Sequence, residues 1–294
     1  MSGPILVTGA GGLIGSEAVP LLAAAPWPVV TTARSGLDHH PHHRCDLAVA
    51  EEAASLVAAV RPGTIVHLAG GTGAGRHETY RKNVLSTVHL LDAAARLAAP
   101  PYCIVMGSAA EYGEGNGGLL TETSPLHPVS EYGRAKLAQT TLAESICEFA
   151  GLPLTVVRPF NLVSPRLPAS AALGSMRRQL LEGEGPERTV ECGRLDVVRD
   201  YVPVALVAET LRRLIAKPAP GETINVCSGT GIELGAILAA MAARLGVSLR
   251  IVQRPELLAI PAAPRVAGDP ARLAQVTGLR MAATAEGMAE ILLG

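Results

Sequence analysis

A tyrosine and a lysine, Tyr132 and Lys136, stand four residues apart in the sequence YGRAK. On a helix this spacing places both side chains on one face. A free tyrosine, with a pKa of about 10, is a poor proton donor or acceptor at neutral pH. A neighbouring ammonium stabilises the phenolate and lowers that pKa. The pair therefore predicts a general acid/base, and the lysine can also hold the ribose of a bound nicotinamide nucleotide.

A serine, Ser108, lies in the sequence GSAAEYG directly after an apolar run at residues 102–106. A hydroxyl at the carboxyl end of a parallel strand points into the crevice where cofactors bind. There it can hydrogen-bond a substrate carbonyl and polarise it for hydride attack. By itself the tyrosine–lysine pair is equally compatible with an ordinary surface, and the serine favours the chemical interpretation.

A glycine motif near the start of the chain predicts where a dinucleotide binds. It has the spacing G-x-x-G-x-x-G and lies between an apolar strand at residues 5–8 and a helix. The first glycine allows a sharp turn, the second brings backbone N–H groups close to a pyrophosphate, and the third lets the helix pack on the sheet. The pyrophosphate then lies at a helix N-terminus, which favours an anion. The residues predicted to contact the dinucleotide here are Gly9, Gly12, Leu13, Ile14 and Gly15.

The end of the second predicted strand, residues 31–35, bears on which dinucleotide is bound. A sheet that binds NAD carries an Asp or Glu about 20 residues after the glycines, where it accepts hydrogen bonds from the ribose 2′-hydroxyl. Here the strand ends in Arg34 and Ser35, a guanidinium and a hydroxyl that suit a 2′-phosphate. We therefore predict NADP as the cofactor. The alternative is that Arg34 is simply solvated and that Asp38 turns back to serve NAD.

Strand and helix patterns alternate through the first half of the chain, which predicts an α/β fold with a doubly wound parallel sheet, the Rossmann fold. Beyond about residue 158, segments rich in Pro, Gly and Arg interrupt shorter helices, which is typical of a smaller C-terminal substrate-binding lobe. We expect a dinucleotide-binding domain at 1–160, with returning segments near 194–226, and a mainly substrate-binding lobe at 161–294. The predicted strands are 5–8, 29–32, one ending near 45–46, 64–68, 102–106 and 154–157, and the predicted helices are about 13–24, 49–60, 78–97, 131–150, 204–217 and 234–245.

Composition excludes several classes of partner. The net charge is −1, so the chain has no excess of positive charge with which to bind nucleic acid or an anionic membrane. We see neither a basic signal-peptide start nor an apolar run of membrane-spanning length. The five cysteines are scattered and odd in number, which is typical of reduced thiols in a cytoplasmic protein. A histidine-rich run at residues 39–43 is an alternative metal site, but its proline and contiguous spacing favour an exposed loop, and we expect no metal.

Together these motifs resemble the extended short-chain dehydrogenase/reductase family, the NAD(P)-dependent sugar-nucleotide epimerases, dehydratases and reductases. RPFNLVSPR, VECGRLDVVRDYV and INVCSG are most similar to the branch of the GDP-mannose dehydratases and GDP-4-keto-6-deoxymannose reductases. The matching segments span nearly the whole chain: TGAGGLIG (8–15), CDL (45–47), HLAG (67–70), NV (83–84), GSAAEYG (107–113), YGRAK (132–136), RPFN (158–161), RDYV (199–202), INVCSG (224–229) and GDPARL (268–273).

The resemblance implies a role for each matching residue. Ser108, Tyr132 and Lys136 would form the catalytic triad, and an asparagine at position 83 would tie its helix to the strand ends. Tyr132 and Lys136 would also contact the cofactor. The further residues implied to bind it are Asp46 and Leu47 beside the adenine, Leu68, Ala69 and Gly70 along the pyrophosphate, and Asn83 and Pro159. Those implied to face the sugar nucleotide are Ser108, Ala109, Asn161, Arg199 and Arg265.

The resemblance also implies a homodimer formed through the helices near 78–97 and 131–150. One segment departs from the branch, which tends to carry an Arg and a Glu that grip the nucleotide late in the chain. In LLAIPAAPR at residues 257–265 only Arg265 is present, so the nucleotide is left open.

The residues after Ser108 favour simple ketone reduction. Dehydratases of the family carry an acid/base pair straight after this hydroxyl, and reductases that also epimerise carry a cysteine two residues after it. Here Ala109 and Ala110 follow, and Glu111 comes one position late, which on a strand turns a side chain to the opposite face. We therefore predict NADPH-dependent reduction of a keto group on a nucleotide-linked sugar of the 4-keto-6-deoxyhexose type, with Tyr132 as general acid.

Three alternatives stay open. The first is a sugar-nucleotide 4-epimerase that retains its cofactor, and the second is a ketoreductase of a non-sugar natural product. The third is a non-catalytic dinucleotide sensor on the same fold, because fold alone does not set function. Sensors usually lose part of the catalytic set, and here serine, tyrosine and lysine are all present.

Overall fold

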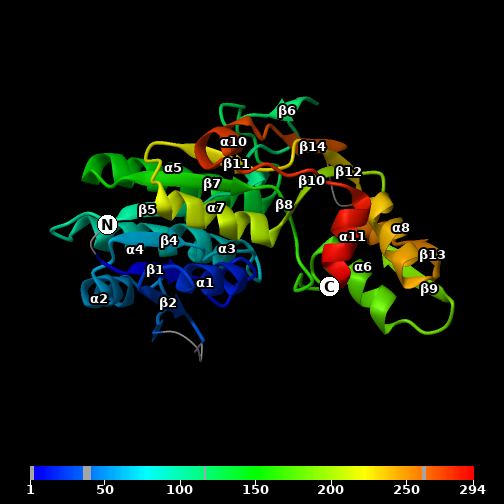
Figure 1. Ribbon diagram of the computed structural model, residues 1–294, viewed down its shortest axis with the longest axis horizontal. Coiled ribbons are helices and arrows are strands. Elements are labelled where there is room, and N and C mark those ends of the chain that lie inside the picture. Colours follow the sequence, from blue (N-terminus) through cyan, green and yellow to red (C-terminus); the bar gives the residue numbers. More distant parts are fainter. Residues whose placement is uncertain (1–2, 36–40, 116, 260–262) are drawn as a thin grey trace.

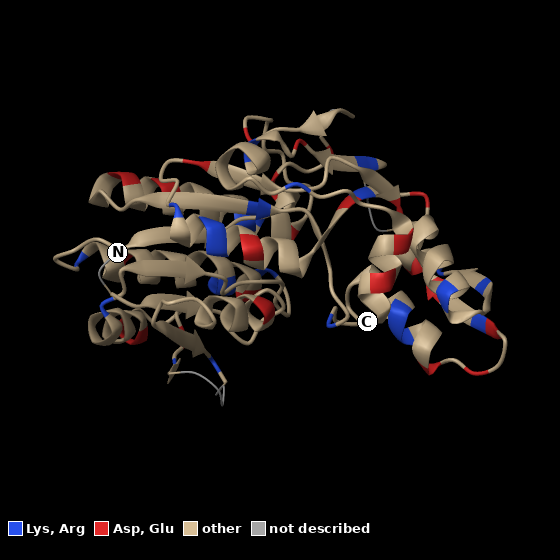
Figure 2. Cartoon of the chain, in the orientation of Figure 1, with Lys and Arg blue, Asp and Glu red and all other residues tan. Residues whose placement is uncertain are grey.

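The computed structural model describes residues 3–35, 41–115, 117–259 and 263–294. Figure 1 shows a large sheet covered by helices and, beside it, a smaller lobe built from later segments of the chain. Acidic and basic residues are interspersed over both parts (Figure 2), in keeping with a net charge of −1.

The large sheet has seven parallel strands in the order β11-β7-β5-β4-β1-β2-β3. From β1 the chain first builds outward to β3 and then returns to build β4 to β11 on the other side. The order therefore reverses between β1 and β4, which makes the carboxyl ends of these strands the switch point where ligands bind. The predicted doubly wound sheet is confirmed. The strands are β1 (Ile5–Thr8), β2 (Val29–Ala33), β3 (His42–Arg44), β4 (Thr64–His67), β5 (Tyr102–Met106), β7 (Leu154–Pro159) and β11 (Thr223–Val226).

Helices cover both faces of this sheet. On one face α1 (Gly15–Ala23) packs beside α7 (Val204–Ala216), and on the other lie α2 (Ala50–Val60), α4 (Ser86–Ala95) and α5 (Glu131–Ala150). Successive strand residues alternate between the two cores: Ile5 and Val7 pack on the α1 side and Leu6 on the α2 side. This two-sided burial explains the continuous apolar runs in the sequence.

The smaller lobe contains strands that the sequence patterns did not predict. Its five-stranded sheet has the order β12-β10-β14-β6, with β8 paired to β10, and β9 and β13 form a separate pair. Helices α6, α8 and α11 close a third core. The bounds are β6 (Leu119–Leu120), β8 (Asn161–Val163), α6 (Ala172–Glu182), β9 (Glu187–Cys192), β10 (Val198–Pro203), β12 (Gly231–Glu233), α8 (Leu234–Leu245), β13 (Ser248–Gln253), α9 (Pro255–Leu258), β14 (Arg265–Gly268) and α11 (Ala285–Leu293). Helix α10 (Ala271–Thr277) instead packs against β11 and α7 of the large sheet.

The segments near 194–226 divide between the two parts. Helix α7 and strand β11 lie with the large sheet, whereas β10 belongs to the five-stranded sheet. The division of the chain into domains stays a prediction.

Two local expectations were wrong. The helix predicted at 78–97 consists of α3 (Arg76–Tyr80), a π-helical turn η1 (Arg81–Leu85) and α4. Of the run at 39–43, predicted to be a loop, His42 and His43 belong to the edge strand β3, and Nδ1 of His42 lies 3.0 Å from the hydroxyl oxygen of Thr31. His39 and His40 lie outside the described residues. Within the described ranges no group of three metal-type ligands occurs, and no helix has the length and apolar character that crossing a membrane requires.

Candidate active site

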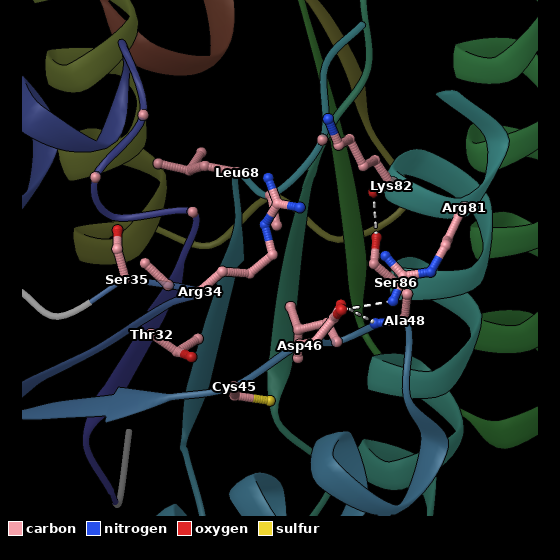
Figure 3. Close-up of a pocket in the computed structure, with 17 residues that line it drawn as sticks. Thr32, Arg34, Ser35, Cys45, Asp46, Ala48, Leu68, Arg81, Lys82 and Ser86 are labelled. Atoms are coloured by element: carbon pink, nitrogen blue, oxygen red, sulfur yellow. Dashed lines mark hydrogen bonds and ion pairs between the residues drawn. The ribbon is translucent and has the colours of Figure 1, made fainter. Parts of the chain in front are cut away.

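Two cavities open at the carboxyl ends of β1, β4 and β5. The first, here the cofactor pocket, has a volume of about 530 Å³, and Figure 3 shows side chains of its lining. The second, here the substrate cleft, has about 730 Å³ and lies toward the smaller lobe. Loop residues that neighbour one another in sequence line the two: Gly70 lines the pocket and Gly71 the cleft. The pocket is lined by Gly9, Gly11, Gly12, Thr32, Ala33, Arg34, Ser35, Cys45, Asp46, Leu47, Ala48, Leu68, Ala69, Gly70, Arg81, Lys82 and Ser86.

The glycine loop has the close approaches that its motif predicts. Gly9 has φ +64°, and a Cβ there would lie 2.6 Å from the amide nitrogen of Ala69. A Cβ on Gly15 would lie 2.5 Å from the carbonyl oxygens of Gly9 and Ala10. The N-terminus of α1 has no side-chain cap. The N–H groups of Ser16 and Glu17 donate to the carbonyl oxygens of Gly12 and Ile14, and the helix dipole at this end favours an anion. Of the remaining motif residues Gly12 lines the pocket, whereas Leu13 and Ile14 line the cleft.

The end of β2 places Arg34 and Ser35 on the pocket wall. The Arg34 side chain is 61% exposed and its Nη1 lies 3.8 Å from a carboxylate oxygen of Glu78. A guanidinium and a hydroxyl thus lie where a 2′-phosphate was predicted. Asp38, the alternative partner for a ribose, lies outside the described residues.

Asp46 lies in the pocket as the resemblance implied, but it has a partner that the sequence did not indicate. Its Oδ2 accepts a hydrogen bond of 2.5 Å from Nη2 of Arg81. Burial opposes ionisation of Asp46, but Arg81 holds the pKa of this carboxyl below its ordinary value. Leu47, Leu68, Ala69 and Gly70 line the same pocket.

Sequence reasoning missed two cations on the turn η1, Arg81 and Lys82, both of which line the pocket. The sequence did contain a signal for them, because Arg81 and Lys82 directly precede Asn83, the residue implied to tie its helix to the strand ends. A π-helical turn, which is often found at functional sites, could not be seen from the residue pattern.

Asn83 lies behind the pocket wall and is fully buried. Its amide nitrogen donates to the carbonyl oxygens of Gly71 and Thr79, at 2.8 and 2.6 Å, and its oxygen accepts the N–H of Gly71 at 3.0 Å. The implied tie between helix and strand ends is therefore present. The amide of Asn83 holds the loop that forms the pocket wall, and its contact with the cofactor stays a prediction.

Ser108 and Tyr132 meet in the substrate cleft. Ser108 caps the short 3₁₀ turn η2 (Ala109–Glu111), and its Oγ accepts the N–H of Ala110 at 3.2 Å. Burial raises the pKa of Tyr132, with a hydrogen bond to Ser108 acting in the opposite direction and the charge of Glu111 raising the pKa further. The expected lowering of the pKa of Tyr132 by Lys136 is therefore wrong for the protein without its ligands.

Lys136 follows Tyr132 by one turn of α5 and is almost fully buried. Its Nζ donates to the carbonyl oxygen of Met106 at 2.5 Å and to Oε1 of Gln139 at 2.6 Å. Burial lowers the pKa of Lys136 to about 8, although the charge of Glu111 acts to raise it. Gln139 was missed, and its position one helical turn after the lysine is the signal that could have found it.

Glu111 does not line the cleft. The reason is not the alternation of side chains along a strand that was assumed from the sequence. Glu111 lies in the 3₁₀ turn, fully buried. Its Oε2 pairs with Nε of Arg158 at 2.9 Å, and its Oε1 accepts the N–H of Ser108 at 2.8 Å and the hydroxyl of Thr140 at 3.1 Å. Glu111 thus joins the serine turn to α5 and β7 and has no access to substrate.

Most of the residues implied to face the sugar nucleotide line the cleft. Ala109, Asn161 and Arg199 do so, together with Pro159, which was assigned to the cofactor. Nδ2 of Asn161 donates to the carbonyl oxygen of Asp200 at 3.2 Å. Burial lowers the pKa of Arg199, as expected of a cation held at a cavity wall.

Arg265 is not among the described residues that line the cleft, and its role toward substrate stays a prediction. Side chains alternate along β14, so that Val266 lines the cleft and Arg265 is turned away from it. The exposed Arg265 lies instead over Gly231, where a Cβ would come 3.0 Å from its Nη1.

The carboxylate of Asp200 joins three motifs from the later part of the chain. This buried carboxylate accepts the N–H groups of Ser228 and Gly229, both at 2.9 Å, and of Gly268 at 3.3 Å. It also accepts the hydroxyl of Ser228 at 2.7 Å. The motifs RDYV, INVCSG and GDPARL therefore meet at one carboxylate, which fixes the loops behind Arg199.

Comparison with known proteins agrees with this geometry. The model of the NAD dependent epimerase/dehydratase family matches residues 5–227. GDP-6-deoxy-D-mannose reductase of Pseudomonas aeruginosa is 30% identical and the match covers 95% of this chain and 92% of the relative. GDP-6-deoxy-D-talose 4-dehydrogenase of Aggregatibacter actinomycetemcomitans is 28% identical, with coverage of 93% and 91%. The structure of RMD from Pseudomonas aeruginosa complexed with NADPH aligns with a TM-score of 0.84 at 27% identity, over 99% of this chain and 98% of that one. The chain therefore belongs to the NAD-dependent epimerase/dehydratase family and is an NAD(P)-dependent oxidoreductase of the extended short-chain dehydrogenase/reductase type.

Proposed function

We propose that the protein uses NADPH to reduce a keto group on a nucleotide-linked sugar, of the 4-keto-6-deoxyhexose type, with Tyr132 as the proton donor. The observation that carries the proposal is the composition of the cleft around Ser108. Two hydroxyls, of Ser108 and Tyr132, line it beside Ala109 and Ala110, while Glu111 is buried in an ion pair. None of the described residues that line the cleft carries a carboxylate, so these can protonate one oxygen but supply no acid/base pair for removing water. The names of the two curated relatives, a reductase and a 4-dehydrogenase, support the same chemistry.

The residues present fit a nicotinamide dinucleotide, because the glycine loop leaves a cradle that a Cβ at Gly9 or Gly15 would fill. When bound, NADPH supplies a hydride from its nicotinamide ring to the carbonyl carbon. The glycine loop and the N-terminus of α1 would hold the pyrophosphate, and Asp46 and Leu47 would flank the adenine.

The protein's own part is to hold the carbonyl and deliver a proton. The hydroxyls of Ser108 and Tyr132 donate hydrogen bonds to the carbonyl oxygen, where negative charge develops. Tyr132 then gives its proton to the new alkoxide. Its raised pKa keeps the phenol protonated at neutral pH, so the group is ready to act as an acid.

Lys136 would stabilise the phenolate left by that step. An ammonium has three N–H donors, and within the described residues that of Lys136 has two side-chain hydrogen bonds, to Met106 and Gln139. The third donor is left for a ribose hydroxyl of the cofactor.

The choice of NADPH over NADH rests on Arg34 and Ser35 at the end of β2. A charge-assisted hydrogen bond contributes about 1.5–3 kcal/mol, so Arg34→Ala should weaken NADPH binding about ten- to a hundredfold. NADH affinity should stay as in the wild type, since NADH has no 2′-phosphate. Equal affinity of the wild type for both cofactors, or unchanged NADPH binding by the variant, would refute this choice.

The reaction is tested by supplying nucleotide-linked 4-keto-6-deoxysugars with [4-²H]NADPH. We expect stoichiometric loss of nicotinamide absorbance and, by NMR, deuterium on the carbon of the new hydroxyl. Interconversion of two saturated sugars without net NADPH loss would favour a 4-epimerase. A binding screen with GDP, UDP, dTDP and CDP would identify the nucleotide, and oxidation of NADPH by no keto sugar nucleotide would favour a sensor.

We further propose a homodimer, supported by apolar side chains exposed on α5 and η1. Phe149 and Leu142 on α5 are 94% and 39% exposed, and Leu85 on η1 is 43% exposed. Exposed apolar patches of this kind are typical of protein interfaces. Light scattering should give the mass of two chains, and Phe149→Glu should shift it toward one. A wild-type mass of a single chain would refute the dimer.

We also propose that the protein works in the cytoplasm. The support is that the five cysteines are free and buried, as is usual where thiols are kept reduced. Fractionation of the native cells with an antibody to the chain should find it with cytoplasmic markers, and recovery with an exported fraction would contradict the proposal.

A further inference from the structure

The cofactor pocket holds more positive than negative side-chain charge. Among the described residues that line it, Arg34, Arg81 and Lys82 are cations. All three lie within 4 Å of one carboxylate, that of Glu78, at 3.8, 3.8 and 3.6 Å. Asp46 adds one further carboxylate, which pairs with Arg81. Three cations thus share two carboxylates before any ligand is bound.

The two cations on η1 point to different parts of the pocket. Figure 3 shows Arg81 turned toward Asp46, whereas Lys82 extends away from Asp46 along the wall. The side chain of Lys82 is 24% exposed, so its ammonium is accessible from the pocket.

The position of Lys82 is set by its neighbour Asn83, which locks η1 onto the loop at Gly71. The same loop meets the glycine loop, because a Cβ on Gly9 would lie 2.6 Å from the nitrogen of Ala69. Lys82 therefore lines the same pocket as the glycine loop and sits next to the residue that fixes the loop facing it. Arg34 starts from the end of β2 and reaches across the pocket, so that its guanidinium and the ammonium of Lys82 approach the same oxygen, Oε1 of Glu78.

We propose that Lys82 binds the pyrophosphate of the dinucleotide, exchanging its ion pair with Glu78 for a phosphate oxygen. The inference rests on the proposed function only in that the pocket binds a nicotinamide dinucleotide. A part-exposed Lys–Glu pair one helical turn apart contributes little stability and is readily exchanged. A charge-assisted hydrogen bond to a phosphate, at the positive end of a helix, is the stronger interaction.

The test compares ligands that differ in which phosphates they carry. Lys82→Ala should weaken NADPH and NADH by the same factor, about tenfold, since both contain the pyrophosphate. Binding of adenosine 2′-monophosphate, which has no pyrophosphate, should not change. Arg34→Ala should show the reverse pattern, with loss of NADPH and of adenosine 2′-monophosphate and unchanged NADH.

Two further variants separate charge from folding. Lys82→Arg keeps the charge and should bind both dinucleotides within about threefold of the wild type, and Glu78→Gln, which removes the competing carboxylate, should tighten both. Lys217→Ala, at the exposed end of α7, is the matched control and should change neither. Thermal unfolding of each variant shows that the fold is kept.

Loss of NADPH affinity alone in Lys82→Ala would place the lysine at the 2′-phosphate and overturn the proposal, as would unchanged affinity for both dinucleotides. Either result would leave the proposed reductase function intact, because that function is judged on turnover by the wild type. Failure of the wild type to bind any dinucleotide would instead count against the function itself.

Discussion

Glu111 and Arg158 form a buried ion pair, and we predict that replacing both residues lowers the free energy of unfolding less than replacing Arg158 alone. Glu111 is fully buried and Arg158 is 4% exposed. Removing one partner of such a pair leaves an uncompensated charge and destabilises by about 3–5 kcal/mol, whereas replacing both by apolar groups is often nearly neutral. Arg158→Met should therefore lower the free energy of unfolding by about 3–5 kcal/mol.

The double variant Glu111→Leu/Arg158→Met removes both charges but also the acceptor used by Ser108 and Thr140. Each lost hydrogen bond contributes about 1 kcal/mol, so the double variant should lose only about 2–3 kcal/mol. It should thus be more stable than Arg158→Met by about 1–2 kcal/mol. Guanidinium unfolding at pH 7.5 measures both values. A double variant that loses as much as the two single variants added together would refute the account of the pair.

Three further predictions concern stability and binding. His67 is fully buried between the hydroxyls of Thr8 and Thr87, and burial lowers its pKa to about 3. The unfolded chain therefore takes up the proton first, so the stability that neutral His67 contributes is present above pH 6.5 and is lost as the pH falls toward 3. In urea titrations from pH 6 to pH 4, wild-type stability should fall more steeply than that of His67→Gln by about 1.4 kcal/mol per pH unit, and parallel curves would contradict this. Gly9→Ala should destabilise by about 1–3 kcal/mol and weaken NADPH binding in calorimetry, and unchanged affinity would show that the loop does not approach the cofactor. Asp200→Asn should raise the KM for the sugar nucleotide with little change in the Kd of NADPH, because the loops behind the cleft loosen; an effect on NADPH alone would count against that role.

Much of the large sheet could be predicted because its signals are local. Buried parallel strands form short apolar runs, and the glycine spacing at 9–15 has a direct steric cause in the close contacts of Gly9 and Gly15. The helix that carries Tyr132 and Lys136 begins at Glu131 and ends at Ala150, as its pattern indicated. The placement of Ser108 at the end of β5 follows from the same strand rule.

The smaller lobe could not be predicted in the same way. Strands β9 and β13 pair residues about 60 positions apart, and β9 alternates exposed and buried residues only partly. Their pairing depends on a third core that forms only when distant helices meet.

Contacts between side chains on different helices and strands could not be predicted from the sequence either. The ion pair of Glu111 with Arg158 joins residues 47 positions apart, and Glu111 adopts a 3₁₀ turn where a strand was assumed. A partner of this kind changes what a residue can do: a carboxylate that looks available in the sequence is held inside the protein. The same holds for Asp46, whose pairing with Arg81 spans 35 positions.

The central claim is that Tyr132 protonates the oxygen of the reduced carbonyl, and Tyr132→Phe tests it most directly. Single-turnover reduction of a nucleotide-linked 4-keto-6-deoxysugar should be followed by NADPH absorbance, alongside the Kd of NADPH. We predict that the variant reduces the substrate at least about a thousandfold more slowly, while its NADPH affinity stays within about threefold of the wild type, because the groups that position the cofactor are unchanged. Near-normal reduction by the variant would contradict the account, since the proton would then come from another group.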